Sequence, residues 1–409
     1  QLLVKLNHMK NIKYNLASDS WDSEEISAIN DVIKSNRYTM GPKVKKFEDE
    51  FASHFNSDYA IMVNSGSSAN LLMIASLFYS KEYDLKEGDE VIVPAVSWST
   101  TYYPVHQYGL KLVFVDVDRD TLNISPEEIK KAISPKTKVI FAVNLLGNPC
   151  EFDEIIRICK KNNIILIEDN CESLGAKYQE KFTGTCGIMG SFSFFFSHHL
   201  QTMEGGMILT NDKNLYELCV SLRAHGWIRD LPDDNSKEKK TGNSFHDSFN
   251  FVTPGYGTRP LEMSGAIGSV QLQKLPIFIS NRKKNATIFK SLFENEPNIA
   301  IQQETEVSSW FGFSLLLTNK LSSFRDDLIN ILKENNIECR PIVAGNFTKN
   351  PVIKFMDYDI RGELSASDEI DKNGFFVGND FRDLKNEIHY LHDLIKDFEK
   401  SVLLDRKQK

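Results

Sequence analysis

Ser193-Phe-Phe-Phe-Ser-His-His-Leu-Gln-Thr-Met-Glu-Gly-Gly206 is the stretch that decides the fold. Its first residues belong to an apolar run, 192–196, which predicts a buried strand. Two adjacent histidines, His198 and His199, follow that run, and the Glu-Gly-Gly that ends the stretch predicts a turn. An isolated pair of histidines indicates a metal ligand or a core residue at least as well as a catalytic base. The assignment therefore depends on the sequence around it.

Short apolar runs alternate with helical patterns between about residues 58 and 210. The other runs are 59–63, 90–93, 112–116, 139–143, 164–167 and 207–210. Strands that are buried on both faces have this appearance, and their alternation with helices is typical of an α/β domain with a mostly parallel sheet. We expect the ligands of such a domain beyond the carboxyl ends of its strands.

The remainder of the chain has an α+β pattern. Residues 230–248 are polar and predict a surface loop, and 261–275 predicts a helix. Further on we expect helices at 281–295 and 324–335, a strand at 310–317 and a final amphipathic helix around 388–398. The sequence thus predicts a large domain at 9–275 and a smaller C-terminal domain at 276–409. His8-Met9 resembles a cloning junction, so residues 1–8 are interpreted as vector-derived.

Composition narrows the class of partner. The chain has 409 residues and a formal net charge of −8, and no basic face indicates a nucleic-acid partner. No apolar run approaches the roughly 20 residues that span a bilayer, so we expect no membrane partner. The six cysteines form no C-x-C or C-x-x-C pair, which predicts reduced thiols in the cytoplasm and neither a metal site nor an iron–sulfur cluster.

Three other motifs each allow two interpretations. Gly66 and Ser67 lie in a turn that follows a strand and opens a helix, where an anion binds or a serine simply caps the helix. Asp169 ends a buried strand and could pair with a protonated pyridine nitrogen or cap the next helix. Trp98 follows another strand and could stack on a flat ring or belong to the core.

Their order removes much of this ambiguity. A phosphate turn, an aromatic residue, a strand-end aspartate and a strand-end basic residue follow one another as in aspartate-aminotransferase-like (fold type I) enzymes, which use pyridoxal phosphate (PLP). From about residue 13 to 400 the chain resembles the sugar aminotransferase family often called DegT–StrS. The stretches that carry the resemblance are 93–103, 143–149, 223–227, 259–266 and 338–343, together with the family pattern S-F-x-x-x-K-x-[LI]-x-x-x-E-G-G. His198 stands where that pattern has its PLP-binding lysine.

The resemblance implies roles for individual residues. It implies that the phosphate is held by Gly66, Ser67 and Ser193, that the ring is held by Trp98, Asp169 and Glu172, and that His198 is the catalytic base with His225 beside it. The family is dimeric with shared active sites, and Phe249 falls in the segment that crosses to the partner. Arg229 and Arg340 could pair with a substrate diphosphate, although surface salt bridges are the alternative. Gly257 stands where the family usually has an asparagine that reaches the partner's cofactor phosphate.

Histidine in place of lysine changes the expected reaction. An imidazole cannot form the stable covalent bond with PLP that a lysine amine forms, so PLP or its amine form, PMP, would be held non-covalently. Within the family this histidine implies a 3-dehydratase that acts on a nucleotide-linked 4-keto-6-deoxy sugar in polysaccharide sugar biosynthesis, with L-glutamate as the amino donor. GDP-4-keto-6-deoxy-D-mannose is the best candidate substrate, while CDP- and dTDP-linked sugars stay open.

Two rival hypotheses accompany this one. The chain could be a sugar aminotransferase that uses another lysine, and Lys181 and Lys213 are the nearest in sequence. It could also be a sugar-nucleotide binding or regulatory protein that has lost catalysis. An intact Asp169, Trp98 and phosphate turn count against such decay.

Overall fold

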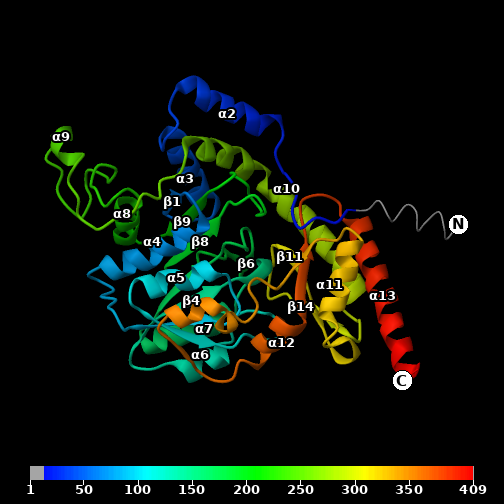
Figure 1. The fold of residues 1–409 in the computed structure, drawn as a ribbon. Coiled ribbons are helices and arrows are strands. Elements are labelled where there is room, and N and C mark those ends of the chain that lie inside the picture. Colours follow the sequence, from blue (N-terminus) through cyan, green and yellow to red (C-terminus); the bar gives the residue numbers. More distant parts are fainter. Residues whose placement is uncertain (1–12, 409) are drawn as a thin grey trace.

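A large eight-stranded sheet and a separate four-stranded sheet organise the chain (Figure 1). The computed structural model describes residues 13–408, so the segment interpreted as vector-derived, 1–8, lies outside the described residues. The large sheet has the order β1-β9-β8-β5-β4-β2-β3-β13. Its strands are β1 Tyr59–Val63, β9 Gly206–Thr210, β8 Met189–Ser193, β5 Ile165–Asp169, β4 Thr137–Val143, β2 Glu90–Pro94, β3 Lys111–Val115 and β13 Tyr358–Ile360.

Strand β9 makes the large sheet mixed. It pairs antiparallel with both β1 and β8, whereas all the other neighbours in the sheet pair parallel. Strand β1 therefore runs in the same direction as β8, and the carboxyl ends of β1, β8, β5, β4 and β2 lie along one edge. The predicted α/β fold, with a mixed and mostly parallel sheet, is confirmed.

Both faces of the large sheet are buried, which explains why its strands appear in the sequence as unbroken apolar runs. Within β1, Ile61 and Val63 belong to one core, whereas Ala60 and Met62 belong to another. The first core contains residues of α4 Gly66–Tyr79, α5 Ser99–Gln107 and α8 Lys213–Arg223. Helix α3 Pro42–His54 shares the second core, and α6 Pro126–Ala132 and α7 Phe152–Asn162 share a third.

The four-stranded sheet is antiparallel and has its own apolar core. It consists of β10 Ile299–Ala300, β11 Gly312–Leu317, β14 Gly374–Gly378 and β12 Cys339–Arg340. Residues of α11 Arg325–Glu334 and α13 Lys385–Gln408 contribute to that core. Helix α12 Ser365–Asn373 packs near β11 and β14. The smaller elements are α2 Ser23–Ser35, α9 Ser244–Asp247, β6 Lys177–Tyr178, β7 Lys181–Phe182 and the 3₁₀ turns Leu145–Gly147, Asn319–Leu321, Phe347–Lys349 and Pro351–Phe355.

One helix joins the two sheets. We expected separate helices at 261–275 and 281–295, but α10 runs without a break over Glu262–Phe293 with Pro276 inside it. A proline removes one hydrogen bond from a helix interior. Helix α10 nevertheless packs against α3 and α2 and also against α13, and these tertiary contacts stabilise it as one continuous helix. The predicted boundary at 275/276 falls inside this helix, and the division into two domains remains a proposal.

The strand before the histidines is placed differently from its prediction. We predicted a strand at 192–196, whereas β8 covers Met189–Ser193. The ladder with β9 ends at the pair Ser193–Gly206, and Phe195 and Phe196 beyond it are largely exposed. In the sequence, Phe195 and Phe196 predicted a buried strand, because hydrophobicity alone does not distinguish buried aromatic residues from exposed ones.

Two kinds of feature are absent from the described residues, 13–408. None of their helices is both long and apolar enough to cross a membrane. They also contain no cluster of three or more His, Cys, Asp or Glu side chains arranged to hold a metal ion, and the six cysteines are unpaired.

Candidate active site

The carboxylate of Asp169 lies at the carboxyl edge of the large sheet and is held by three hydrogen-bond donors. Asp169 is the last residue of β5 and is 6% exposed. Asn70 Nδ2 and Thr101 Oγ1 each donate to its Oδ2 at 2.8 Å, and the Cys171 amide donates to Oδ1 at 3.2 Å. Three donors from three segments fix the direction of the carboxylate, so it can bind a protonated ring nitrogen in one defined orientation.

The turn before α4 provides a cradle of backbone groups. Ser65 caps α4 by accepting from the Ser68 amide at 3.1 Å, and Gly66 is the first helical residue. A Cβ on Gly66 would lie 2.6 Å from Ser193 Cβ, so this glycine is required for the close approach of α4 to β8. Ser67 is exposed. The first helical N–H groups and the positive end of the helix dipole suit a phosphate group at this point.

Trp98 follows β2, and Glu172 follows β5, the strand that Asp169 ends. Trp98 is the N-cap residue of α5 and is 57% exposed, so its ring is free to stack on a ligand. Glu172 follows β5, and its Oε2 accepts from the Leu146 amide at 3.0 Å. Burial, together with the negative charge of Asp169, raises the pKa of Glu172 to about 7. A carboxyl that is protonated in part of the molecules at neutral pH can donate to a ligand oxygen as well as accept.

His198 lies in a turn after β8, with its amide donating to Phe195 O at 2.9 Å. Its Nδ1 is buried and has no hydrogen-bond partner among the described residues. Its ring meets Phe311 edge to face, with 5.2 Å between the ring centres. Burial first, and the positive charge of Arg282 second, lower the pKa of His198 to about 3. The ring is therefore uncharged near neutral pH, and its unprotonated nitrogen is able to accept a proton.

The neighbouring His199 has a different position. It is 2% exposed, and its Nε2 lies 3.1 Å from the carbonyl oxygen of Ser309. A carbonyl accepts only, so Nε2 carries the proton and donates. Burial holds the pKa of His199 well below its usual value. This histidine ties the turn to the segment before β11, and it is not available to a ligand.

The other predicted site residues lie on separate segments. His225 follows α8 in a left-handed conformation (φ 62°) and packs edge to face on Trp227, with 5.2 Å between the ring centres. Arg229 stacks over the same tryptophan, 3.5 Å from its ring centre, and pairs with Asp230 at 3.4 Å. Phe249 follows α9 and is 70% exposed, and Arg340 is exposed on β12. A role for these four residues in the site stays a prediction.

The two rival lysines lie on other elements than His198. Lys213 opens α8 directly after β9, which is antiparallel to β8, and pairs with Asp234 at 2.6 Å. It therefore lies at the opposite edge from His198. Lys181 is exposed on β7, in a separate two-stranded hairpin. Neither Lys181 nor Lys213 therefore occupies the position of His198 after β8, where the family has its PLP-binding lysine.

Sequence reasoning missed the residues that hold the predicted ones. Asn70 lies one turn after the Gly66-Ser67 turn and Thr101 lies within the stretch 93–103, but a side chain that points at Asp169 has no signature in the linear sequence. Phe311 and Leu146 lie far along the chain from His198 and Glu172, which they contact. No local pattern could have found them.

These groups fit PLP or PMP held without a covalent bond. The anchored carboxylate suits the ring nitrogen, the cradle suits the phosphate, the exposed indole suits the ring face and the Glu172 carboxyl suits the ring oxygen. His198 presents a neutral nitrogen where a lysine amine is expected, and its Nδ1 is buried without a partner, which leaves Nε2 for a ligand.

Comparison with known proteins adds to this geometry. The model of the DegT/DnrJ/EryC1/StrS aminotransferase family matches residues 19–378. The chain is 55% identical, over 387 residues, to a GDP-4-keto-6-deoxy-D-mannose 3-dehydratase of Yersinia pseudotuberculosis. The aligned region covers 94% of this chain and 98% of that relative.

Two solved structures of GDP-4-keto-6-deoxymannose-3-dehydratase are similar over nearly their whole length. One contains a trapped PLP-glutamate geminal diamine, with 53% identity, a TM-score of 0.91 and coverage of 93% of this chain and 99% of that one. The other is a histidine-to-asparagine variant with bound GDP-perosamine, with 53% identity, a TM-score of 0.92 and the same coverage.

Proposed function

This chain belongs to the DegT/DnrJ/EryC1/StrS aminotransferase family, and on that premise we propose that it is a PLP/PMP-dependent nucleotide-sugar 3-dehydratase. Its substrate is a nucleotide-linked 4-keto-6-deoxyhexose, with GDP-4-keto-6-deoxy-D-mannose as the first candidate. The observation that carries the proposal is His198, an imidazole in place of the family's covalent lysine, which follows β8 at the same sheet edge as the anchored Asp169 and the Gly66 turn. The 55% identity to a relative of that name over 94% of this chain supports the same substrate.

Each residue of the site has one task in this reaction. When bound, PMP supplies the amine that joins the 4-keto carbon and a ring that takes up electrons. Asp169 keeps the ring nitrogen protonated, and Trp98 stacks on the ring and shields it from water. His198 accepts a proton at Nε2, because its Nδ1 is enclosed by protein. Glu172 holds the ring oxygen.

Glutamate is the amino donor that keeps the overall reaction balanced. The sugar loses its 3-hydroxyl oxygen, and the α-carbon of glutamate gains one oxygen while its nitrogen is released as ammonia. The products are a 4-keto-3,6-dideoxy sugar, 2-oxoglutarate and ammonia. A solved relative with glutamate bound to PLP supports this choice of donor.

The active enzyme is a homodimer in which each subunit completes the site of the other. Phe249 supports this proposal, together with Phe245 and Phe251, because all three are more than half exposed on the segment that carries α9. In Figure 1 this segment extends away from the rest of the molecule. Exposed aromatic groups on a projecting segment are typical of a surface that a second subunit covers. The enzyme works in the cytoplasm, where its six unpaired cysteines stay reduced.

The test is a product analysis. Purified protein is incubated with PLP, L-glutamate and GDP-4-keto-6-deoxy-D-mannose, and the mass of the sugar nucleotide is measured by mass spectrometry. A product lighter by one oxygen, with ammonia released, is expected, and His198→Asn should lose it while still binding PLP. A 4-amino sugar that keeps its 3-hydroxyl would identify an aminotransferase instead. Without turnover, CDP- and dTDP-linked 4-keto sugars are the next substrates to test.

A further inference from the structure

The segment Ser309–Phe311, just before β11, lies between the two histidines and a buried arginine. On one side the Phe311 ring contacts both imidazoles, with 5.2 Å between ring centres for His198 and 5.7 Å for His199. The Ser309 carbonyl binds His199 Nε2. On the other side Arg282 Nη1 donates to the carbonyl oxygens of Trp310 at 3.4 Å and Phe311 at 3.1 Å. The arginine thus binds the backbone of the segment that contacts both histidines, through the Phe311 ring and the Ser309 carbonyl oxygen.

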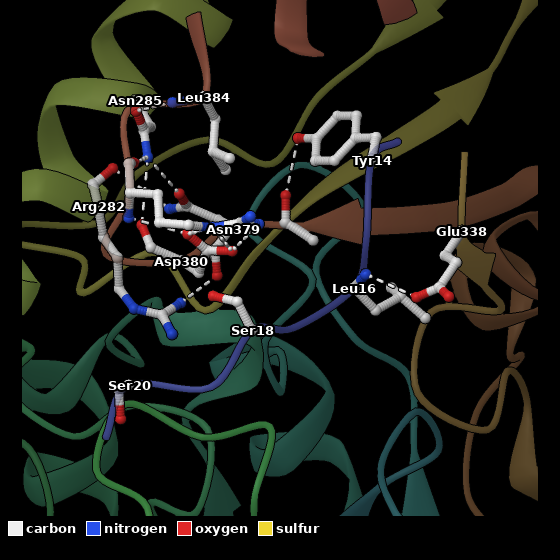
Figure 2. A network of polar contacts seen from close by, with 12 residues as sticks. Tyr14, Leu16, Ser18, Ser20, Arg282, Asn285, Glu338, Asn379, Asp380 and Leu384 are labelled. Atoms are coloured by element: carbon white, nitrogen blue, oxygen red, sulfur yellow. Dashed lines mark hydrogen bonds and ion pairs between the residues drawn. The ribbon is translucent and has the colours of Figure 1, made fainter. Parts of the chain in front are cut away.

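Arg282 is itself held at one end of its guanidinium, where Nη1 makes every hydrogen bond recorded for this side chain, while its buried Nε has no partner among the described residues. It projects from α10, is 4% exposed and also donates to the carbonyl oxygen of Asn379 at the end of β14. The Asn379 side chain returns two bonds, to the carbonyl oxygens of Arg282 at 3.2 Å and of Trp310 at 2.8 Å. Asp380 lies close enough to offset part of the cost of burying the guanidinium. Figure 2 shows Arg282, Asn379, Asp380 and Asn285 gathered at this junction.

The same segment also supports the ring-oxygen side of the site. The Phe311 amide donates to the carbonyl oxygen of Leu146 at 3.0 Å, and the amide of Leu146 donates to Glu172. Leu146 and Trp310 are both non-glycine residues in the left-handed region, with φ of 53° and 51°. Such conformations persist only where the surroundings determine them, and they gather at functional sites. The segment therefore positions two groups of the proposed site, His198 and Glu172, and Arg282 anchors it.

We propose that Arg282 is a positioning residue for the proposed dehydration, which acts through Phe311 to hold the His198 ring in its proton-accepting orientation. The inference rests on the proposed function. The positive charge of Arg282 also lowers the pKa of both histidines, which keeps their rings uncharged before the reaction. An arginine that only joins α10 to the four-stranded sheet would affect stability and would leave the chemistry of His198 unchanged.

The experiment is a double-mutant cycle on the holoenzyme with Arg282→Met, Phe311→Leu and the double variant. Arg282→Lys restores the charge without the planar fork. Arg382→Met is the matched control, since Arg382 belongs to the same network and pairs with Asp380 at 2.7 Å. Arg382→Met removes the ion-pair partner of the buried Asp380 carboxylate, so this variant is a control for a loss of stability alone. For each variant, kcat, KM, the PLP dissociation constant and Tm are measured.

We expect Arg282→Met to lower kcat by roughly 10- to 100-fold, with KM and PLP affinity unchanged, because a misplaced catalytic group slows chemistry more than binding. Arg282→Lys should recover part of the loss. The double variant should be no slower than the slower single variant, since both act on one ring. The proposal is overturned if Arg282→Met and Arg382→Met lower Tm alike and both keep the wild-type kcat, or if the effects of the two single variants multiply.

A second readout keeps this inference separate from the proposed function. Spectra of ¹⁵N-histidine-labelled protein without substrate are recorded, and His198 is assigned by its loss in His198→Asn. One sharp set of imidazole signals is expected in the wild type and in Arg382→Met, and averaged or broadened signals in Arg282→Met. If the three proteins show these signals but the wild type forms no dideoxy sugar, the proposed dehydratase function is refuted and the positioning role of Arg282 is kept. Unchanged His198 signals in Arg282→Met would refute the positioning role alone.

Discussion

Gly66→Ala is expected to weaken cofactor binding, because the ends of β5 and β8 leave no room for a methyl group at the start of α4. A Cβ on Gly66 would lie 2.6 Å from Ser193 Cβ and 2.8 Å from Cys171 Sγ. Carbon atoms that are not bonded pack at about 3.5–4.0 Å, so the new methyl overlaps its neighbours by roughly 1 Å. Ser193 ends β8 and Cys171 follows β5 closely, so neither can swing aside without disturbing the sheet.

The size of the effect follows from this overlap. Overpacking by one methyl group costs about 1–3 kcal/mol in a well-packed region. The strain is relieved if the first turn of α4 moves outward, and then the N–H groups of the phosphate cradle move with it. At about 1.4 kcal/mol for each factor of ten, the affinity for PLP should fall by about 5- to 150-fold.

Gly257→Ala is the matched control for this substitution. The nearest atom to a Cβ on Gly257 is His225 Cε1 at 3.5 Å, which is an ordinary contact. Both variants and the wild type are titrated with PLP, cofactor absorbance is followed, and Tm is measured without cofactor. If Gly66→Ala bound PLP as tightly as the wild type and melted at the same temperature, the steric argument would be refuted.

Three further predictions test the charge, the covalent chemistry and the phosphate contacts of the site. Glu172 has a pKa of about 7 when folded against 4.5 for the free side chain, so folding favours its protonated form. The stability of the cofactor-free wild type relative to Glu172→Gln should therefore be highest below pH 4.5 and decline as the pH rises through 7, which thermal melts across that range would measure. Borohydride added to the PLP complex should leave Lys181 and Lys213 unlabelled in a peptide map, because neither lies beside the cofactor site; a labelled lysine would favour the aminotransferase hypothesis. Gly257→Asn should bind PLP more tightly by restoring a phosphate donor, and an unchanged dissociation constant would contradict that role.

The sequence predicted the residues that depend on local chain geometry. Strand-end residues such as Asp169 can be located because an apolar run ends there, and the turn at Gly66 because a glycine and serines precede a helical pattern. Since the strands are mostly parallel, these ends had to meet at one edge of the sheet. The element order and most of the cofactor-site motifs could therefore be placed before any coordinates were known.

The errors came from packing between distant segments. Two helices were predicted where α10 is continuous, because the cost of Pro276 is visible in the sequence but the surfaces on which α10 packs are not. The strand before the histidines was placed too late, because the exposed Phe195 and Phe196 are indistinguishable from core residues in a hydrophobic pattern. The lowered pKa of His198 could not be predicted from the sequence, because the burial of its ring and the charge of Arg282 both depend on the folded chain.

By itself the sequence determined the order of strands and helices, the positions of the cofactor motifs and the exchange of lysine for His198, because each depends on residues close together in the chain. Only the tertiary structure decided which groups act on those motifs. Asn70 and Thr101 orient Asp169, the Leu146 amide binds Glu172, and the ring of Phe311, whose carbonyl oxygen accepts from Arg282, packs on the His198 imidazole. These contacts join segments that are remote in sequence, and they form only when the sheet, its helices and the segment before β11 pack together and exclude water.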